Sequence, residues 1–305
     1  MRVALFGGTG FVGSYLVDAL VAAGHDPALL VRPGSEAKVR HVDRCRLIPG
    51  HISDDEAVAE AVSYCDAVIY NIGILREFPD DGITFKALQY DGVMRVAERS
   101  MDSGVKRFLL MSANGVKPNG TPYQETKYLA ERFVAQSEME YTIFRPSIVF
   151  GDPRGRMEFC TQLRDEMIRP PIPAPNFYTG KSAKSGGFSM SPVHVRDVAE
   201  AFVRSLPDPT TYSATYPLCG PEAVPWPDII RRIAAACGRR KLVMPAPAGL
   251  VGAVAAVFDR FPWFPVTRDQ LTMLMEGNTG DSSEVFADLG IEPTPFGVEQ
   301  LSYLR

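Results

Sequence analysis

The run Val3-Ala4-Leu5-Phe6-Gly7-Gly8-Thr9-Gly10-Phe11-Val12-Gly13 decides the fold of this chain. Its four apolar residues predict a buried strand, and the apolar positions of residues 11–23 predict a helix directly after the glycines. Gly7, Gly10 and Gly13 form a GxxGxxG turn between the two. Glycines there allow a tight turn, let the backbone approach a pyrophosphate and place that anion at a helix N-terminus. The run therefore predicts a nucleotide site that opens an α/β domain.

Short apolar runs alternate with longer amphipathic ones through the first half of the chain. We expect strands at Val3–Phe6, Ala28–Val31, Arg46–Ile48, Ala67–Tyr70, Phe108–Met111 and Thr142–Phe144, and helices near residues 11–23, 54–63, 84–103 and 124–137. Strands that read as continuous apolar runs, separated by helices, indicate a parallel sheet covered on both faces. The expected fold class is α/β, a doubly wound sheet of the Rossmann type.

The pattern changes after Gly151, because eighteen of the 25 prolines lie in residues 153–305. Residues 170–175 (PPIPAP) exclude a helix interior or a central strand, and Lys181–Met190 is typical of a loop. Helical periodicity returns at 195–206, 226–238, 267–276 and 296–304. We expect residues 1–152 with 191–206 to form the dinucleotide-binding part, and 153–190 with 207–305 to form a smaller, α-rich cap that binds substrate.

Composition excludes several functional classes. There are 32 Lys+Arg and 36 Asp+Glu, a net charge of −4, which argues against a nucleic-acid partner. The five cysteines and four histidines show no metal-ligand spacing, so we expect no metal site and a reducing, cytoplasmic setting. The longest uncharged stretch, Leu242–Phe258, is shorter than the roughly 20 residues of a spanning helix. A buried helix, an apolar lid over a hydrophobic substrate and a face resting on a membrane all stay open for it.

The end of the second expected strand bears on the choice of cofactor. Arg32 lies 19 residues past Gly13, and Ser35 and Lys38 follow it. A carboxylate near this position binds the ribose diol of NAD, whereas an arginine accommodates the 2′-phosphate of NADP. We therefore expect NADP(H) in preference to NAD(H). The alternative is a solvated arginine on a loop.

A second motif carries potential chemistry. Tyr123 and Lys127 are four residues apart in an expected helix, hence neighbours on one face, and Ser112 ends the fifth expected strand. A phenol with a pKa near 10 transfers protons poorly at neutral pH. A nearby ammonium lowers that pKa, which suits proton transfer to a carbonyl oxygen, and Ser112 is placed to polarise the same oxygen. The three residues predict acid–base catalysis.

Together these motifs resemble the short-chain dehydrogenase/reductase superfamily, in its extended or atypical form. The resemblance covers essentially the whole chain, including Asn71-Ile72-Gly73, residues 145–151 (RPSIVFG) and residues 192–199 (PVHVRDVA). Residues 265–271, 289–293 and 301–304 resemble the group that contains the NADPH-binding accessory subunit of respiratory complex I and its bacterial relatives. The chain departs from the family pattern at Gln89, where relatives carry an asparagine, at His51 and at Phe150.

The resemblance implies roles for specific residues. The cofactor would contact Gly7, Thr9, Gly10, Phe11, Val12, Gly13, Arg32, Ser35, Lys38, Ile52, Asn71, Ile72, Gly73, Lys127, Pro146 and Ser147. Ser112, Tyr123 and Lys127 would carry hydride-transfer, epimerase or dehydratase chemistry on a small, hydrophobic molecule. The alternative is a non-catalytic NADPH-binding structural or assembly protein, peripheral to a membrane complex at the inner face of a membrane. The oligomeric state stays open.

Overall fold

The computed structural model describes residues 1–178, 187–247, 249 and 267–305, and the chain divides into two compact units. Unit 1 contains Met1–Pro146, Val195–Leu218 and Ser283–Glu292. Unit 2 contains Ser147–His194, Cys219–Ser282 and Pro293–Arg305. Residues 207–218 and 283–292, which the sequence assigned to the cap, therefore belong to the unit that carries the glycine turn.

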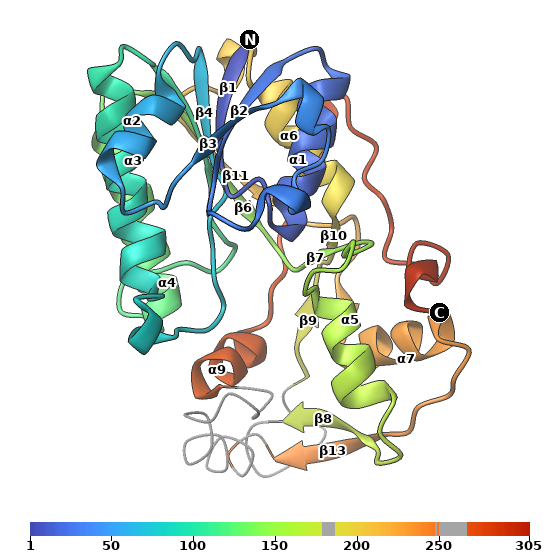
Figure 1. The fold of residues 1–305 in the computed structure, drawn as a ribbon. Coiled ribbons are helices and arrows are strands. Elements are labelled where there is room, and N and C mark those ends of the chain that lie inside the picture. The colour runs from blue at the N-terminus through green and yellow to red at the C-terminus, as the bar shows by residue number, and fades with distance from the viewer. Residues whose placement is uncertain (179–186, 248, 250–266) are drawn as a thin grey trace. The chain divides into compact units, whose positions relative to one another are not determined.

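Seven strands within the described residues form one sheet in unit 1 (Figure 1). They are β1 (Arg2–Phe6), β2 (Asp26–Val31), β3 (Arg46–Pro49), β4 (Ala67–Tyr70), β5 (Arg107–Met111), β6 (Glu140–Pro146) and β11 (Ala214–Leu218). Their order is β11-β6-β5-β4-β1-β2-β3, and every neighbouring pair is parallel. The predicted doubly wound parallel sheet is confirmed. The first six strands lie within two residues of their predicted limits.

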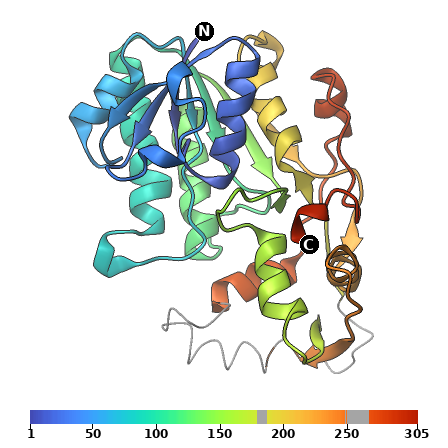
Figure 2. The ribbon, with the colours of Figure 1, turned by 45° about the vertical axis from the view of Figure 1, so that its right-hand side comes forward.

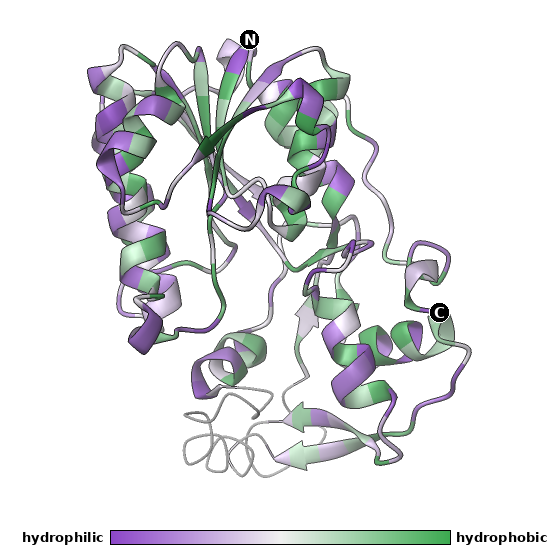
Figure 3. Ribbon diagram, in the orientation of Figure 1, coloured by the Kyte–Doolittle hydropathy of each residue, from purple (hydrophilic) through white to green (hydrophobic). Residues whose placement is uncertain are grey.

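Helices cover both faces of this sheet. They are α1 (Phe11–Ala22), α2 (Asp55–Val62), α3 (Gly92–Asp102), α4 (Pro122–Gln136) and α6 (Val195–Ser205), with the short α10 (Ser283–Asp288). α1 and α6 lie on one face, and α2, α3 and α4 on the other (Figures 1 and 2). Hydrophobic residues follow the strands, while hydrophilic residues mark the outer sides of the helices (Figure 3). The core therefore lies along both faces of the sheet.

The helix predicted at residues 84–103 has a π-helical first part, Lys86–Asp91, ahead of α3. The Tyr70 hydroxyl donates a hydrogen bond to the Leu88 carbonyl, inside this π-helical part. Gly92 leaves room for this approach, because a Cβ there would lie 2.3 Å from Tyr70 Oη. A side chain inserted into a helical ladder is a recognised cause of such irregularity.

Unit 2 is built from short elements. Its helices are α5 (Phe159–Leu163), continued by a π-helical turn at Arg164–Ile168, α7 (Trp226–Ala236) and α9 (Arg268–Glu276). In the described part of the unit, three two-stranded sheets pair β7 (Val149–Phe150) with β10 (Val193–His194), β9 (Ser189–Met190) with β12 (Val224–Pro225), and β8 (Ala174–Tyr178) with β13 (Val243–Pro247). The proline-rich segment thus ends in a strand outside any large sheet, as its prolines require.

Two expectations for unit 2 need correction. Residues 296–304 contain only a 3₁₀ turn at Ser302–Leu304, since Gly297 and the prolines before it delay helix formation. Their periodicity reflects the burial of Phe296, Leu301 and Leu304 in the core of unit 2. Residues 243–247 form a strand, so the buried helix that was one of three alternatives for Leu242–Phe258 is wrong for this part. Residues 248 and 250–258 of that stretch and residues 181–186 of the expected loop lie outside the described residues. No described helix is long and apolar enough to cross a membrane.

A buried arginine links three parts of unit 1. Arg107, at the start of β5, donates hydrogen bonds to the carbonyls of Ser205 (2.6 Å), Leu206 (3.2 Å) and Glu140 (2.8 Å). Its guanidinium lies 4.5 Å from the centre of the Tyr212 ring. Burial lowers the pKa of Arg107 to about 10, which still leaves it charged at neutral pH. The side chain fastens the end of α6 to the sheet.

Arg107→Ala should lower the free energy of unfolding by about 3 kcal/mol, because buried carbonyl groups lose their donors. Arg99→Ala is the matched control, since the side chain of Arg99 is 39% exposed and forms surface ion pairs with Asp55 and Asp102. Urea unfolding followed by circular dichroism measures both variants. Equal losses of stability would contradict the role assigned to Arg107.

Candidate cofactor and active site

The turn after β1 requires glycine at two positions. Gly7 has a φ of +94°, and a Cβ there would lie 2.9 Å from the Asn71 carbonyl oxygen. A Cβ on Gly13 would lie 2.0 Å from the Gly7 carbonyl oxygen, well inside contact distance. The Gly10 amide also donates to the Gly7 carbonyl, at 3.1 Å. The three glycines therefore fold the loop back onto itself at the start of α1.

This loop lies where the strand order reverses, because β1 pairs with β2 on one side and β4 on the other. No side chain caps α1 at Gly10, and its first turn contains no acidic residue. Its first amide groups and the helix dipole thus favour an anion here. This turn fits a dinucleotide pyrophosphate, because bare glycine backbone beside the uncapped start of a helix is suited to bind an anion.

The residues predicted to select the cofactor follow β2, the neighbour of β1. The Ser35 amide donates to the Arg32 carbonyl at 2.9 Å, and the Lys38 amide donates to Ser35 at 3.0 Å. These turns bring the three residues together at the carboxyl end of the strand. Arg32 and Lys38 are exposed and Ser35 is buried. Two cationic side chains thus lie beside the strand that leads into the glycine turn.

Other predicted contacts lie after β3 and β4. Ile52 is half-buried and packs against the hydrophobic core that covers the sheet. The Asn71 amide donates to the Phe6 carbonyl at 2.9 Å, which keeps the end of β4 beside the end of β1. Gly73 lies near the catalytic candidates, because a Cβ there would lie 3.5 Å from Lys127 Nζ. Ile72, between them, is half-buried.

A capping box positions the helix that carries the YxxxK motif. The Gln124 amide donates to Thr121 Oγ1, and the Thr121 amide donates to Gln124 Oε1 at 2.9 Å. Pro122 occupies the first turn, where its missing N–H costs nothing. These residues begin α4 two residues before its predicted start. Tyr123 therefore lies in the first turn and Lys127 one turn later.

Tyr123 is half-buried, and its ring lies edge-on to Phe85 with 5.7 Å between ring centres. Burial raises the pKa of its phenol to about 12. The expectation that Lys127 lowers this pKa is therefore wrong for the chain by itself, because desolvation acts in the opposite direction. The phenol stays protonated at neutral pH and is available as a hydrogen-bond donor.

Lys127 is only 3% exposed, and its Nζ donates to the Met111 carbonyl at the end of β5 over 2.8 Å. Burial lowers the pKa of this ammonium to about 8, while the nearby Glu131 carboxylate raises it. One hydrogen bond leaves two of the three ammonium protons for other partners. A charged donor is thus held between the ends of β4 and β5.

Ser112 is buried, and its hydroxyl donates to Glu131 Oε1. Arg145 binds both oxygens of the same carboxylate through one edge of its guanidinium, with Nε 2.8 Å from Oε1 and Nη2 bonded to Oε2. Sequence reasoning missed Glu131, although it follows Lys127 by one helical turn and lies on the same face of α4. The Ser112 hydroxyl therefore already donates its hydrogen to Glu131. We had expected it to donate to the carbonyl oxygen of a substrate.

The remaining predicted residues fall at the end of β6 and beyond. Pro146 ends that strand, and its carbonyl accepts a hydrogen bond from the Asn114 amide at 2.8 Å. Ser147 belongs to unit 2, where its hydroxyl donates to the Asn278 carbonyl at 2.9 Å. Gln89 is buried, donates to the Ile74 carbonyl at 2.8 Å and accepts from the Thr126 hydroxyl at 3.1 Å. It joins the π-helical turn to α4.

Comparison with known families agrees with this geometry. Residues 7–209, about two thirds of the chain, match a family model described as NAD(P)H-binding. The chain belongs to this NAD(P)H-binding family. Strands β1 to β6, α4 and the glycine turn all lie inside the matched range.

Three curated relatives of this family member align over most of its length. The 40 kDa subunit of NADH-ubiquinone oxidoreductase from Neurospora crassa is 26% identical, over 99% of this chain and 78% of that protein. Photosystem II assembly factor Ycf39 from Synechocystis is 23% identical, over 96% and 86%. The 3 beta-hydroxysteroid dehydrogenase/Delta 5-->4-isomerase of Mycobacterium tuberculosis is 26% identical, over 81% and 73%. The chain thus aligns with proteins named as oxidoreductases or their subunits and with a protein named as an assembly factor.

Solved structures support the fold. The UDP-glucose 4-epimerase of Thermus thermophilus, in complex with NAD, superposes with a TM-score of 0.73 at 20% identity. The match covers 100% of this chain and 97% of the epimerase. At this identity the likeness shows that the two chains share an overall fold.

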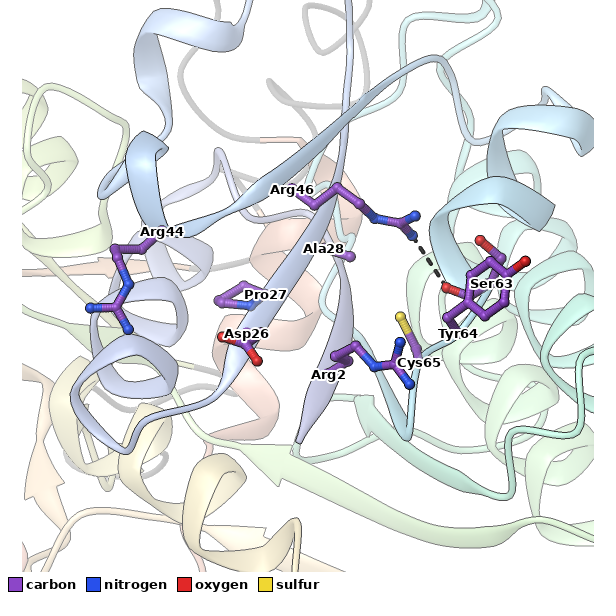
Figure 4. Close-up of a pocket in the computed structure, with 9 residues that line it drawn as sticks. All are labelled: Arg2, Asp26, Pro27, Ala28, Arg44, Arg46, Ser63, Tyr64 and Cys65. Carbon is purple, nitrogen blue, oxygen red and sulfur yellow. Dashed lines mark hydrogen bonds between the residues drawn. The ribbon is translucent and has the colours of Figure 1, made fainter.

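A pocket of about 190 Å³ lies at the opposite edge of the sheet, where the strands begin (Figure 4). Its lining includes Arg2, Asp26, Arg46, Tyr64 and Cys65. Arg46 is already bonded to the carbonyls of residues 60, 61 and 63 at the end of α2, which is a structural role. No metal-binding cluster occurs among the residues that the structure describes. The carboxyl edge, where the glycine turn, Gly73 and Lys127 lie, is the candidate site.

Gly10→Ala should leave the protein folded and weaken dinucleotide binding at least tenfold. A Cβ on Gly10 would lie 3.4 Å from the Gly7 carbonyl oxygen, which is tolerable contact, but it would fill space that a pyrophosphate needs. Gly13→Ala should instead lower the melting temperature, because its Cβ has no room. Thermal unfolding and fluorescence titration with NADPH separate the two effects. Full affinity in Gly10→Ala would contradict this position of the site.

Proposed function

We propose that the chain is an NADP(H)-dependent oxidoreductase that interconverts a carbonyl and an alcohol on a small, hydrophobic molecule. One observation carries the proposal. Lys127 is buried against the end of β5, beside Gly73 and on the same helical face as Tyr123. Burying an ammonium group costs free energy unless the group binds a partner, so a buried lysine marks a candidate functional site. An epimerase or dehydratase step would use the same residues.

Each residue has a defined part in this chemistry. A bound nicotinamide supplies or receives the hydride. The Tyr123 phenol, protonated at neutral pH, donates to the substrate oxygen and transfers its proton there during reduction. Lys127 directs its two free protons to the ribose hydroxyls. Ser112, whose hydrogen is bonded to Glu131, offers an acceptor oxygen to the substrate. Tyr123 is therefore the acid in this proposal.

Arg32, with Ser35 and Lys38, is proposed to select NADP(H) over NAD(H). Arg32→Ser should weaken NADPH binding about tenfold or more and leave NADH binding nearly unchanged, since a guanidinium–phosphate pair is a strong, charge-assisted contact. Arg44→Ser is the control, because Arg44 is also exposed but lines the pocket at the other edge. Calorimetric titration with both cofactors measures the change. Equal losses for NADPH and NADH would contradict selection by Arg32.

Tyr123→Phe tests the catalytic proposal. It should lower kcat/KM for NADPH-dependent carbonyl reduction by about 10²- to 10⁴-fold, because the acid is lost, and leave NADPH affinity within about twofold. The exposed Tyr64 supplies the control variant, Tyr64→Phe. The assay follows NADPH absorbance with a panel of hydrophobic aldehydes and ketones. Undiminished turnover in Tyr123→Phe would refute the mechanism.

A second candidate function is a non-catalytic, NADPH-binding structural or assembly role at a membrane complex. The respiratory subunit and the photosystem II assembly factor among the relatives favour it. Exposed apolar side chains on unit 2 also favour it, with Ile172 66%, Leu242 65% and Met244 49% exposed. Under this proposal the protein lies in the cytoplasm, peripheral to the inner face of a membrane. NADPH binding without any carbonyl turnover by the wild-type protein would favour this function.

A further inference from the structure

The face of α4 that points into unit 1 carries three polar side chains, each one helical turn apart. They are Tyr123, Lys127 and Glu131, and the last two are 3% and 4% exposed. Side chains four residues apart are neighbours on a helix surface. Lys127 thus lies between the phenol and a buried carboxylate. The function proposed above uses the first two residues and leaves Glu131 without a role.

The Glu131 carboxylate collects donors from two neighbouring strands. Ser112 follows β5, and Arg145 in β6 supplies two guanidinium nitrogens. Only the Arg145 side chain reaches solvent, with 35% of it exposed. Several short, charge-assisted hydrogen bonds hold a buried carboxylate in a fixed direction. The direction of the Glu131 carboxylate therefore depends on the ends of β5 and β6 as well as on α4.

This carboxylate determines the direction of the Ser112 hydroxyl. A serine has one hydroxyl hydrogen and two lone pairs. While the hydrogen is bonded to Glu131, Ser112 offers only lone pairs to a ligand. A ligand group opposite Ser112 Oγ must then be a donor, such as a substrate hydroxyl, and a carbonyl oxygen would find only Tyr123.

The same carboxylate bears on the charge of Lys127. Two backbone groups face this side chain, the Met111 carbonyl from β5 and the backbone at Gly73 after β4. Tyr123 and Glu131 face it from its own helix. Arg145 from β6 lies beyond Glu131, to which it is bonded. Glu131 is the anion in this set. Burial lowers the pKa of Lys127 and the Glu131 carboxylate raises it, and the net result is a pKa of about 8.

We propose that Glu131, held by Arg145, is a positioning residue of this site: it keeps Lys127 in its ammonium form at neutral pH and turns the Ser112 hydroxyl into a hydrogen-bond acceptor. The inference rests on the proposed function only for the use made of Lys127 and Ser112. The charge state and the hydroxyl direction are properties of the chain itself.

Magnitudes show why the first effect matters. An opposite charge within about 4–6 Å shifts a pKa by roughly 1–3 units. With a pKa of about 8, Lys127 is about nine-tenths protonated at pH 7. A fall of about one unit would leave only about half of it charged. Loss of Glu131 would therefore lower the fraction of molecules with a charged Lys127 from about nine-tenths to about half at neutral pH.

NMR titration of protein labelled with [¹³C]lysine tests the charge. The Lys127 resonance is assigned by its absence in Lys127→Arg, and we expect a midpoint near pH 8 in the wild type. Glu131→Gln, which preserves the side-chain shape, should lower this midpoint by about 1 pH unit or more. Glu125→Gln, on the exposed side of the same helix, should leave it unchanged. An unchanged midpoint in Glu131→Gln overturns the proposal.

Glu131→Asp separates charge from packing, because it keeps the carboxylate. Its midpoint should stay within about half a unit of the wild-type value. A fall as large as in Glu131→Gln would assign the effect to packing and overturn the proposal.

Neutron diffraction from the wild-type protein tests the hydroxyl direction without any variant, since hydrogen positions are otherwise inferred. The Ser112 deuteron is expected on the line to Glu131, and a deuteron directed elsewhere overturns the proposal. Both experiments run without cofactor. They therefore fail or succeed independently of NADPH binding and carbonyl turnover, which test the proposed function.

Discussion

The close approach of Gly13 to the Gly7 carbonyl is the constraint on which the rest of unit 1 depends. At 2.0 Å from a Cβ position to an oxygen, no side chain fits, so the chain must turn tightly from β1 into α1. That turn directs the start of α1 over the carboxyl edge of the sheet, at the point where strand order reverses. The uncapped start of α1 favours an anion there, and the neighbouring strands β2, β4 and β5 end at the same edge of the sheet.

Two buried charges lie at this edge of the sheet, on α4. Lys127 and Glu131 are both almost inaccessible, and each has hydrogen-bond partners within unit 1. Polar networks of this kind hold their side chains in one arrangement. The proposed cofactor binding needs only Lys127 and the glycine turn, whereas the proposed carbonyl reduction also needs the Tyr123 proton.

Much of the fold could be predicted from the sequence, because parallel strands buried on both faces read as apolar runs. The limits of β4, for example, follow directly from Ala67–Tyr70. Contacts distant in sequence could not be read in the same way. The hydrogen bond from Tyr70 to Leu88 in the π-helical turn and the pairing of β11 with β6 both join residues distant in sequence. The spacing of Tyr123 and Lys127 could be read from the sequence. The raised pKa of Tyr123 could not, because burial is a property of the packed structure. The spacing of four residues after Lys127 places Glu131 on the same face of the helix. Its role became apparent only from its hydrogen bond with Ser112 in the structure.

A crystal structure of the protein with bound NADPH tests the central claim most directly, namely that the carboxyl edge of the unit 1 sheet is the cofactor site. The account predicts the pyrophosphate on the Gly7–Gly13 turn, the 2′-phosphate within reach of Arg32, and Lys127 Nζ within hydrogen-bond distance of the nicotinamide ribose. Density for the cofactor at the arginine-lined pocket where the strands begin, with the glycine turn empty, would contradict it.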